Sequence, residues 1–238
     1  MYKRTFNIEV SDIDPNYELK LSSIFRMMQD AATGAIDELN MGVERTKNQN
    51  MMWVITRYSV EIYKSLYNLH KVTVITYPGK DMLFIYPRFF ELRDENDEVI
   101  VRASSTWCVL DRDTRKVVSK PFKEIKLEGE HLEGELPLPK KVENTVLNHV
   151  EDRKVRYSDI DLNGHLNNTK YIEYIVDLHN LDFYKKNCIK NFTINYEREA
   201  RCGSKISLNS KLENNVEFIQ GNIDGNDIFN VKIEYEER

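Results

Sequence analysis

Two short stretches decide the fold: SDIDPNYEL at residues 11–19 and SDIDLNGHL at residues 158–166. Six of the nine positions are identical, at an offset of 147 residues. In each copy an amphipathic helical pattern follows, over residues 21–39 in the first and from about residue 168 in the second. A strand-like segment containing Tyr-x-x-Glu comes next in both copies. The shared order of loop, helix and strand predicts an internal duplication.

The ends of these elements carry their own signals. Asn40 and Gly42 mark the end of the first helix, and Asn167 or Asn168 is a suitable N-cap for the second. The turn sequences DEND at 94–97 and DGN at 224–226 predict hairpins. The predicted strands that complete the two units cover residues 53–61, 70–77, 82–93 and 98–111 in the first unit and residues 192–199, 204–213, 215–223 and 227–236 in the second.

The chain is therefore predicted to be α+β, with an antiparallel sheet wrapped around one long helix in each of two units that pack as a pseudo-dimer. Residues 1–122 form the predicted N-terminal unit and residues 146–238 the C-terminal unit. Residues 123–145 between them are rich in Glu, Gly, Pro and Lys and lack a sustained period, so they are expected to be a linker. Whether the whole chain is a monomer or a homodimer stays open.

Composition excludes several classes of protein. Apolar residues make up 41% of the 238 and charged residues 31%, as in ordinary globular proteins. The net charge of −5 argues against a general nucleic-acid binder. Apolar runs are only about five residues long, so we expect no membrane span. With no secretory pattern at the start and three cysteines without a CxxC pair, we expect a cytoplasmic protein with reduced thiols.

The two copies differ in chemistry. Asp161, Asn163 and His165 stand at spacing two ahead of a helix, whereas the first copy has Glu18 where the second has His165. In an extended loop this spacing would point the three side chains the same way, and a helix N-terminus offers N–H groups to an oxyanion. Glu199, predicted to lie on a strand, could activate water. The alternatives are an Asx turn with a cap and a metal site, although no second ligand motif supports a metal.

Four separated blocks resemble the acyl-acyl carrier protein (acyl-ACP) thioesterase family. They are DLNGHLNNTKYI at 161–172, YERE at 196–199, RASSTW at 102–107 with TRK at 114–116, and WVITRY at 53–58. The resemblance implies a double hot-dog fold and hydrolysis of the thioester between a fatty acyl chain and acyl carrier protein (ACP), without a cofactor. Residue by residue, it places the family's catalytic set on Asp161, Asn163, His165 and Glu199.

One position departs from the family pattern. Plant members have Cys directly after the Glu, and this chain has Ala200, with Cys202 two residues further on. A Cys–His covalent mechanism is therefore disfavoured. We expect direct attack by water that Glu199 activates, with Asn163, His165 and helix N–H groups holding the carbonyl oxygen and Asp161 orienting the network.

Binding surfaces can be assigned from residue type. Adaptable apolar side chains of the first repeat are candidates for the acyl tunnel, or ordinary core: Met27, Met28, Met51, Met52, Trp53 and Phe84. ACP is acidic, so cations near the predicted site are candidates for docking it, or a solvated face: Arg153, Lys154, Arg156, Lys170, Arg198, Arg201 and Lys205. An acyl-CoA hydrolase and a non-catalytic acyl-binding protein are the alternative functions, and chain-length preference is not readable.

Overall fold

The computed structural model describes residues 1–80, 82–122, 131–143 and 145–238. The elements of the first half are β1 (Tyr2–Asn7), η1 (Val10–Asp12), α1 (Leu21–Glu38), α2 (Val43–Asn48), β2 (Met51–Ile62), β3 (Lys71–Pro78), β4 (Tyr86–Arg93) and β5 (Val99–Asp111). Those of the second half are β6 (Asn148–Lys154), η2 (Tyr157–Asp159), α3 (Asn168–Val176), α4 (Leu181–Tyr184), β7 (Asn187–Tyr196), β8 (Lys205–Glu213), β9 (Val216–Ile223) and β10 (Asn226–Glu237).

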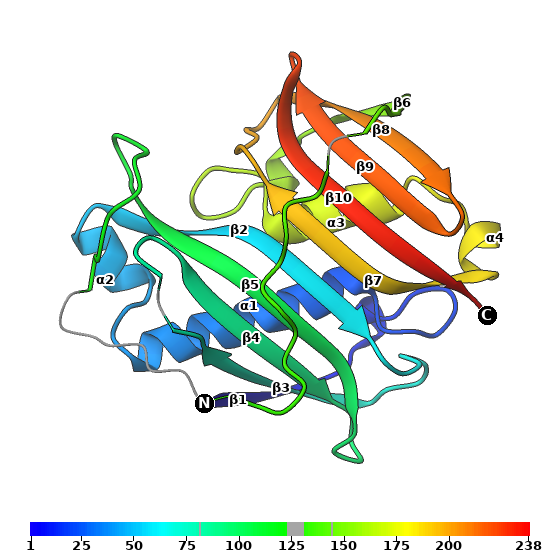
Figure 1. Ribbon diagram of the computed structural model, residues 1–238, viewed down its shortest axis with the longest axis horizontal. Coiled ribbons are helices and arrows are strands. Elements are labelled where there is room, and N and C mark those ends of the chain that lie inside the picture. Colours follow the sequence, from blue (N-terminus) through cyan, green and yellow to red (C-terminus); the bar gives the residue numbers. More distant parts are fainter. Residues whose placement is uncertain (81, 123–130, 144) are drawn as a thin grey trace.

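Within the described ranges, the strands form one antiparallel sheet in the order β1-β3-β4-β5-β2-β7-β10-β9-β8-β6 (Figure 1). The order of the first half is repeated in reverse by the second, so β2 and β7 meet at the middle. There Arg57 pairs with Asn195. When the two repeats are aligned on Tyr58 and Tyr196, Arg57 and Asn195 occupy equivalent positions. The Arg57–Asn195 pair therefore lies on the pseudo-twofold axis that relates the two units. The α+β class and the doubled architecture predicted from the sequence are confirmed.

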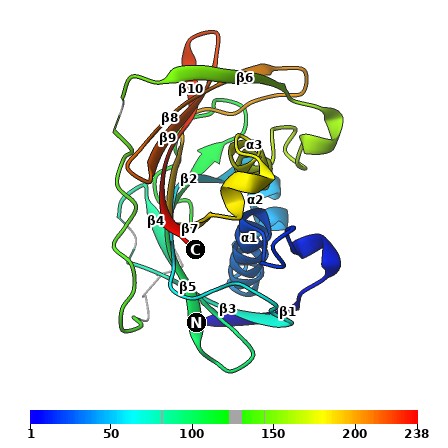
Figure 2. The same cartoon turned by 90° about the vertical axis from the view of Figure 1, so that its right-hand side faces the viewer.

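Helices α1 and α3 pack on the same face of this sheet (Figure 2). The buried apolar side chains of the two helices and of the sheet form one continuous core. Phe25 of α1 contacts Tyr58 of β2 and Phe192 of β7 edge to face, so the first helix packs against both central strands. In the second half Tyr171 of α3 packs on Phe229 of β10. These buried aromatic contacts join the two units into one core.

The two helices differ in length. Helix α1 has 18 residues, whereas α3 has 9 and is followed by the single turn α4. Asn167 caps α3, because its Oδ1 accepts a hydrogen bond from the Thr169 backbone N–H at 2.9 Å. The predicted start of this helix is therefore confirmed. The predicted end of the first helix is confirmed as well, because α1 ends at Glu38 and Asn40 follows in a left-handed conformation.

Most of the remaining strand boundaries agree with the prediction, with two clear errors. The strand predicted over residues 192–199 covers Asn187–Tyr196 instead. The predicted strand over residues 82–93 begins only at Tyr86, because residues 82–85 form a turn with Leu83 at φ 54°. Both hairpin turns, at 94–97 and 224–226, join the strands expected.

The segment 131–143 lies against the face of the sheet opposite to the helices. Its Pro137 carbonyl accepts from Ser104 Oγ at 2.6 Å, and its Glu135 carboxylate accepts from Tyr77. This segment falls within the predicted linker, of which residues 123–130 and 144 lie outside the described ranges. No helix in the described part of the chain is long and apolar enough to cross a membrane.

Candidate active site

The loop at 161–165 is a tight turn rather than the extended segment expected from its spacing. Asp161 Oδ1 accepts hydrogen bonds from the backbone N–H groups of Asn163 at 2.8 Å and His165 at 3.2 Å. The Asp161 N–H donates to the His165 carbonyl at 2.8 Å, and Gly164 has a positive φ of 81° that glycine adopts readily. Asp161 therefore shapes the loop through backbone groups. Spacing alone does not align the three side chains.

Two arginines from the other repeat complete this region. Arg112 and Arg115 follow β5, and both reach the loop of the second repeat. Arg112 donates to Asn163 Oδ1 at 3.3 Å. Arg115 forms an ion pair with Glu199 and lies 3.3 Å from His165 Nε2. Arg112, Arg115, Asn163, His165 and Glu199 thus form one polar cluster. Because its members come from both halves of the chain, the cluster exists only when the two units pack together.

The contact with Arg112 fixes the orientation of the Asn163 amide. A guanidinium can only donate hydrogen bonds, so the oxygen of the amide faces Arg112. The Asn163 NH2 group must then point to the opposite side. Asn163 therefore keeps its amide donor on the side away from Arg112.

His165 is mostly buried, with 13% of its side chain exposed. Burial, and next the positive charge of Arg115, lower the pKa of His165 below its ordinary value, although Asp161 acts in the opposite direction. Both effects favour the neutral form of the ring. Its Nε2 lies 3.2 Å from Glu199 Oε2, within the range for a proton to pass between them.

The prediction that Glu199 lies on a strand is wrong. Strand β7 ends at Tyr196, and Glu199 follows in the irregular segment after it. The neighbouring Ala200 is buried, and its carbonyl accepts from the Leu166 N–H at 2.8 Å, which ties this segment to the 161–165 loop. Cys202 is a free thiol, exposed in the turn that follows.

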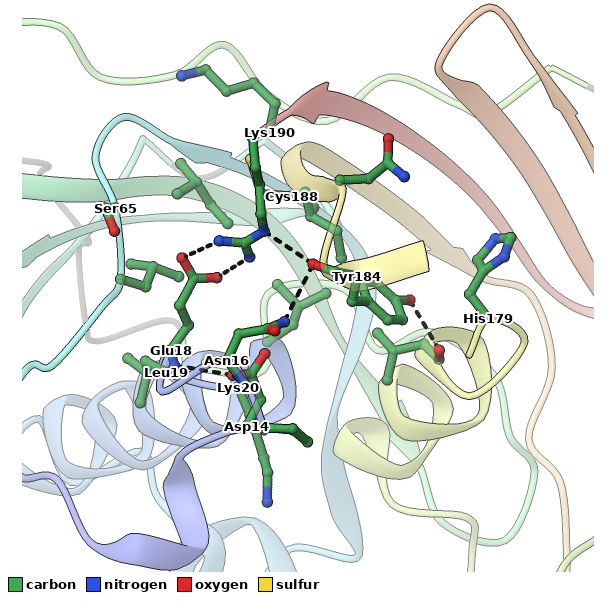
Figure 3. A pocket seen from close by; sticks show the side chains of 18 of the residues that line it. Asp14, Asn16, Glu18, Leu19, Lys20, Ser65, His179, Tyr184, Cys188 and Lys190 are labelled. Carbon is green, nitrogen blue, oxygen red and sulfur yellow. Dashed lines mark hydrogen bonds and ion pairs between the residues drawn. The ribbon is translucent and has the colours of Figure 1, made fainter. Parts of the chain in front are cut away.

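The first repeat keeps the same loop geometry without the same side chains. Asp14 Oδ1 accepts from the backbone N–H groups of Asn16 at 2.8 Å and Glu18 at 3.0 Å, as Asp161 does in the second repeat. Glu18 forms a bidentate ion pair with Arg238, just beyond β10. Asn16 donates its amide to the Tyr184 carbonyl at 3.2 Å (Figure 3). The counterpart loop is thus satisfied by groups of the protein itself.

The candidates for the acyl tunnel divide into three sets. Met27 and Met28 are fully buried in the main core between α1 and the sheet. Met51, Met52 and Trp53 begin β2 beside the cluster, where Arg115 Nη1 lies 2.9 Å from Met52 Sδ. Phe84 is 46% exposed in the turn before β4.

The cations proposed for ACP docking have different surroundings. Arg153 pairs with Glu151 and Asp177, Lys170 with Glu173, and Lys205 with Asp152. Arg201 is close enough to His165 to disfavour a proton there. The three that remain are exposed on the strand, loop and turn around the cluster: Lys154, Arg156 and Arg198. Among the described residues, no group of three His, Cys, Asp or Glu side chains could hold a metal ion.

The fold and this site define a double hot-dog protein with a polar cluster built from both of its units. Family models of acyl-ACP thioesterases match nearly the whole chain, the N-terminal domain over residues 1–125 and the C-terminal domain over residues 142–237. The chain belongs to the acyl-ACP thioesterase family.

Individual relatives agree with this assignment. The chloroplastic palmitoyl-acyl carrier protein thioesterase of Arabidopsis thaliana is 25% identical over an alignment of 229 residues, and the match covers 88% of this chain and 54% of that protein. The chain thus spans about half the length of the curated relatives it matches. An acyl-ACP thioesterase from Bacteroides thetaiotaomicron superposes with a TM-score of 0.88 at 24% identity, covering 98% of this chain and 97% of that one. The 12:0-ACP thioesterase of Umbellularia californica gives 0.85 at 19% identity, with coverage of 100% and 97%.

Sequence reasoning brought together Asn163, His165 and Glu199 but assigned no role to Arg112 or Arg115. A signal was available, because the TRK block at 114–116 was one of the family-like segments. The sequence did not indicate that this block, just after β5, contacts the loop at 161–165 of the other repeat.

Proposed function

We propose that the protein hydrolyses fatty acyl-ACP thioesters to the free fatty acid and holo-ACP, and so terminates fatty acid synthesis. The observation that carries this proposal is the contact of Glu199 with both Arg115 and His165, beside an Asn163 amide that is oriented to donate. A carboxylate base, a neutral imidazole and an amide donor are the groups that attack of water on a carbonyl requires.

In this mechanism Glu199 accepts a proton from water as the water oxygen bonds to the thioester carbonyl carbon. The Arg115 guanidinium orients the carboxylate through their ion pair. Asn163 donates its free N–H to the carbonyl oxygen as negative charge develops there. Asp161 acts indirectly, because it holds the backbone of Asn163 and His165 in place.

The intermediate then collapses with cleavage of the C–S bond. The leaving thiolate needs a proton, since a thiol ionises only near pH 8.5. The proton taken up by Glu199 passes to the sulfur, with His165 Nε2 as the relay at 3.2 Å from Glu199 Oε2. Each turnover consumes one water and returns Glu199 and His165 to their starting states. Cys202 has no part in these steps.

The proposed partner is ACP with its acyl-phosphopantetheine arm. The exposed Lys154, Arg156 and Arg198 provide unlike charge for an acidic protein around the cluster. The start of β2, with Met51, Met52 and Trp53, would contact the acyl chain next to the reacting carbonyl. Docking through charge makes the rate on acyl-ACP fall steeply with salt, whereas hydrolysis of a small thioester changes little.

The test is single-turnover hydrolysis of one acyl chain presented on ACP and on CoA, with the wild type and with Glu199→Gln. Faster turnover of the ACP thioester, lost in the variant, supports the proposal. Preference for the CoA thioester would instead support the alternative acyl-CoA hydrolase. Acyl binding without turnover of either thioester would make this a non-catalytic acyl-binding protein.

A further inference from the structure

A large cavity lies at the pseudo-twofold mate of the candidate active site. It has a volume of about 830 Å³, within the range of small-molecule sites. The loop at 14–18 forms one wall, and the end of β2, the end of α3 and the start of β7 form the others (Figure 3). None of the four predicted catalytic residues lines it.

The cavity has a simple structural cause. Helix α3 ends at Val176, half as long as α1, and α4 follows as a single turn. The inner face of the sheet near Ile62 and Ile189 is therefore left without a long helix above it. Apolar side chains from both units form this part of the wall: Leu19, Leu21, Ile62, Leu66, Val176 and Ile189.

The charged side chains of the wall already have partners. Lys64 pairs with Glu98, and the Lys20 ammonium donates to the carbonyl of Ser11, a residue outside the wall, at 2.8 Å. Glu18 is paired with Arg238, and Glu236 with Lys190 at 3.6 Å. Glu173 and Asp177 are paired with cations outside the cavity, Lys170 at 2.7 Å and Arg153 at 3.4 Å. Asp14 accepts two backbone N–H groups of its own loop. A wall whose charges already have partners favours a neutral ligand over a fatty acid anion, because an anion would need an unpaired cation.

We propose that this cavity is a second, non-hydrolytic binding site for the neutral acyl-pantetheine portion of an acyl thioester. The inference rests on the proposed thioester chemistry of the first site. The cavity retains, in residues 14–18, the loop geometry that positions a thioester at the proposed active site. Its apolar wall can contact the acyl chain. It cannot hydrolyse what it binds, because Glu18 replaces the imidazole and is held by Arg238, and the Asn16 amide is engaged with Tyr184.

Cys188 makes the proposal testable without measuring turnover. Cys188 is a lining residue on the same side as Glu18, with His179 on the opposite side (Figure 3), and its thiol donates to the Glu236 carbonyl at 3.4 Å. A pantetheine analogue with a chloroacetamide at the position of the acyl group would be held next to it. The Cys188 sulfur then bonds to the CH2 carbon, chloride leaves, and the thiol proton goes to solvent. Cys202 is exposed outside the cavity and serves as an internal reference.

The measurement is the ratio of alkylation at Cys188 to that at Cys202, by peptide mass spectrometry, for the pantetheine probe and for simple chloroacetamide. We expect the probe to raise this ratio about tenfold, because binding raises the local concentration of the electrophile. Ser65→Trp, which places a large side chain in the cavity wall, should return the ratio to the chloroacetamide value. Asn96→Trp, in the exposed hairpin turn after β4, is the matched control and should keep the wild-type ratio.

Equal ratios for the two reagents in the wild type would overturn the proposal, as would an unchanged ratio in Ser65→Trp. A non-hydrolysable acyl-pantetheine amide should protect Cys188, and the corresponding free fatty acid should not. Stronger protection by the fatty acid would overturn the choice of a neutral ligand. Hydrolysis of acyl-ACP is measured on the same preparation. Hydrolysis without enhanced labelling refutes the second site alone, and labelling without hydrolysis refutes the proposed function alone.

Discussion

The loops at 161–165 and 14–18 have the same backbone hydrogen bonds and different side-chain partners. In both, an Asp carboxylate accepts two backbone N–H groups of its own loop. In the second repeat Arg112 engages the Asn163 oxygen and leaves the amide donor free. In the first repeat the Asn16 amide donor is engaged by the Tyr184 carbonyl. The same turn can therefore present a reactive group or satisfy it internally, and the side chains packed against it decide which.

The largest effect is expected at Glu199. Glu199→Gln removes the base and keeps the shape, so kcat on acyl-ACP should fall by about 10³-fold. Glu61→Gln, at the aligned Tyr-x-x-Glu position within β2, is the matched control and should alter kcat less than twofold. Single-turnover kinetics measures both. Comparable losses in the two variants would show that the chemistry is not confined to one repeat.

Asn163→Ala should lower kcat by about 10²-fold, because a donor to the developing oxyanion is lost. KM should change little, since this hydrogen bond strengthens only in the transition state. Asn16→Ala should instead cost about 1 kcal/mol of unfolding free energy, because it removes the bond to Tyr184. Steady-state kinetics and urea denaturation separate the two results. A rise in KM alone for Asn163→Ala would contradict the assigned role.

Arg115→Met should shift the pH dependence of hydrolysis. A depressed His165 pKa keeps the ring neutral at pH 7, so activity is lost only on acidification below the ordinary histidine value. Removing the nearby positive charge lets the His165 pKa rise, and the acidic limb of kcat/KM should move to higher pH. NMR titration of the ring measures the pKa directly. A limb that stays in place would mean that His165 does not control it.

The same depressed pKa has a consequence for stability. Between the folded and the unfolded pKa of His165 the unfolded chain binds more protons, so the free energy of unfolding falls as the pH falls through this window. In Arg115→Met the window becomes narrower, because the folded pKa lies closer to the unfolded one. Urea denaturation from pH 7 down to pH 5 tests this, and a His165→Gln variant should lack this contribution.

A smaller effect is expected at the counterpart ion pair. Glu18→Gln weakens a partly buried bidentate pair with Arg238 and should lower the unfolding free energy by about 1 kcal/mol. The pair joins the loop at 14–18 to the C-terminal end of the chain, so the loss should be greater at low salt. A variant as stable as the wild type at every salt concentration would show that the pair contributes nothing measurable.

The smallest effect is expected at Cys202. Cys202→Ala should leave kcat and KM within twofold of the wild type, because this exposed thiol is outside the proposed mechanism. A folded but inactive variant would instead restore a covalent mechanism. Circular dichroism distinguishes that outcome from misfolding.

The sequence alone determined the duplication and the fold class, and it pointed to the loop at 161–165 as the candidate site. These depend on local patterns, namely the SDID repeat, the helical period and the hairpin turns, and neighbouring residues are sufficient to specify them. It also identified Asn163, His165 and Glu199 as a candidate set through the resemblance of separated blocks. The error at residues 82–85 arose because a run of apolar residues there forms a turn that periodicity does not distinguish from a strand.

Only the tertiary structure decided how these groups meet. Arg112 and Arg115 reach Asn163, His165 and Glu199 because β2 and β7 pair and bring the end of β5 beside a loop of the other unit. The cavity at the mate loop likewise depends on how far α3 covers the sheet. Contacts between residues separated by 50 or more positions depend on the packing of whole elements, which no local pattern in the chain encodes.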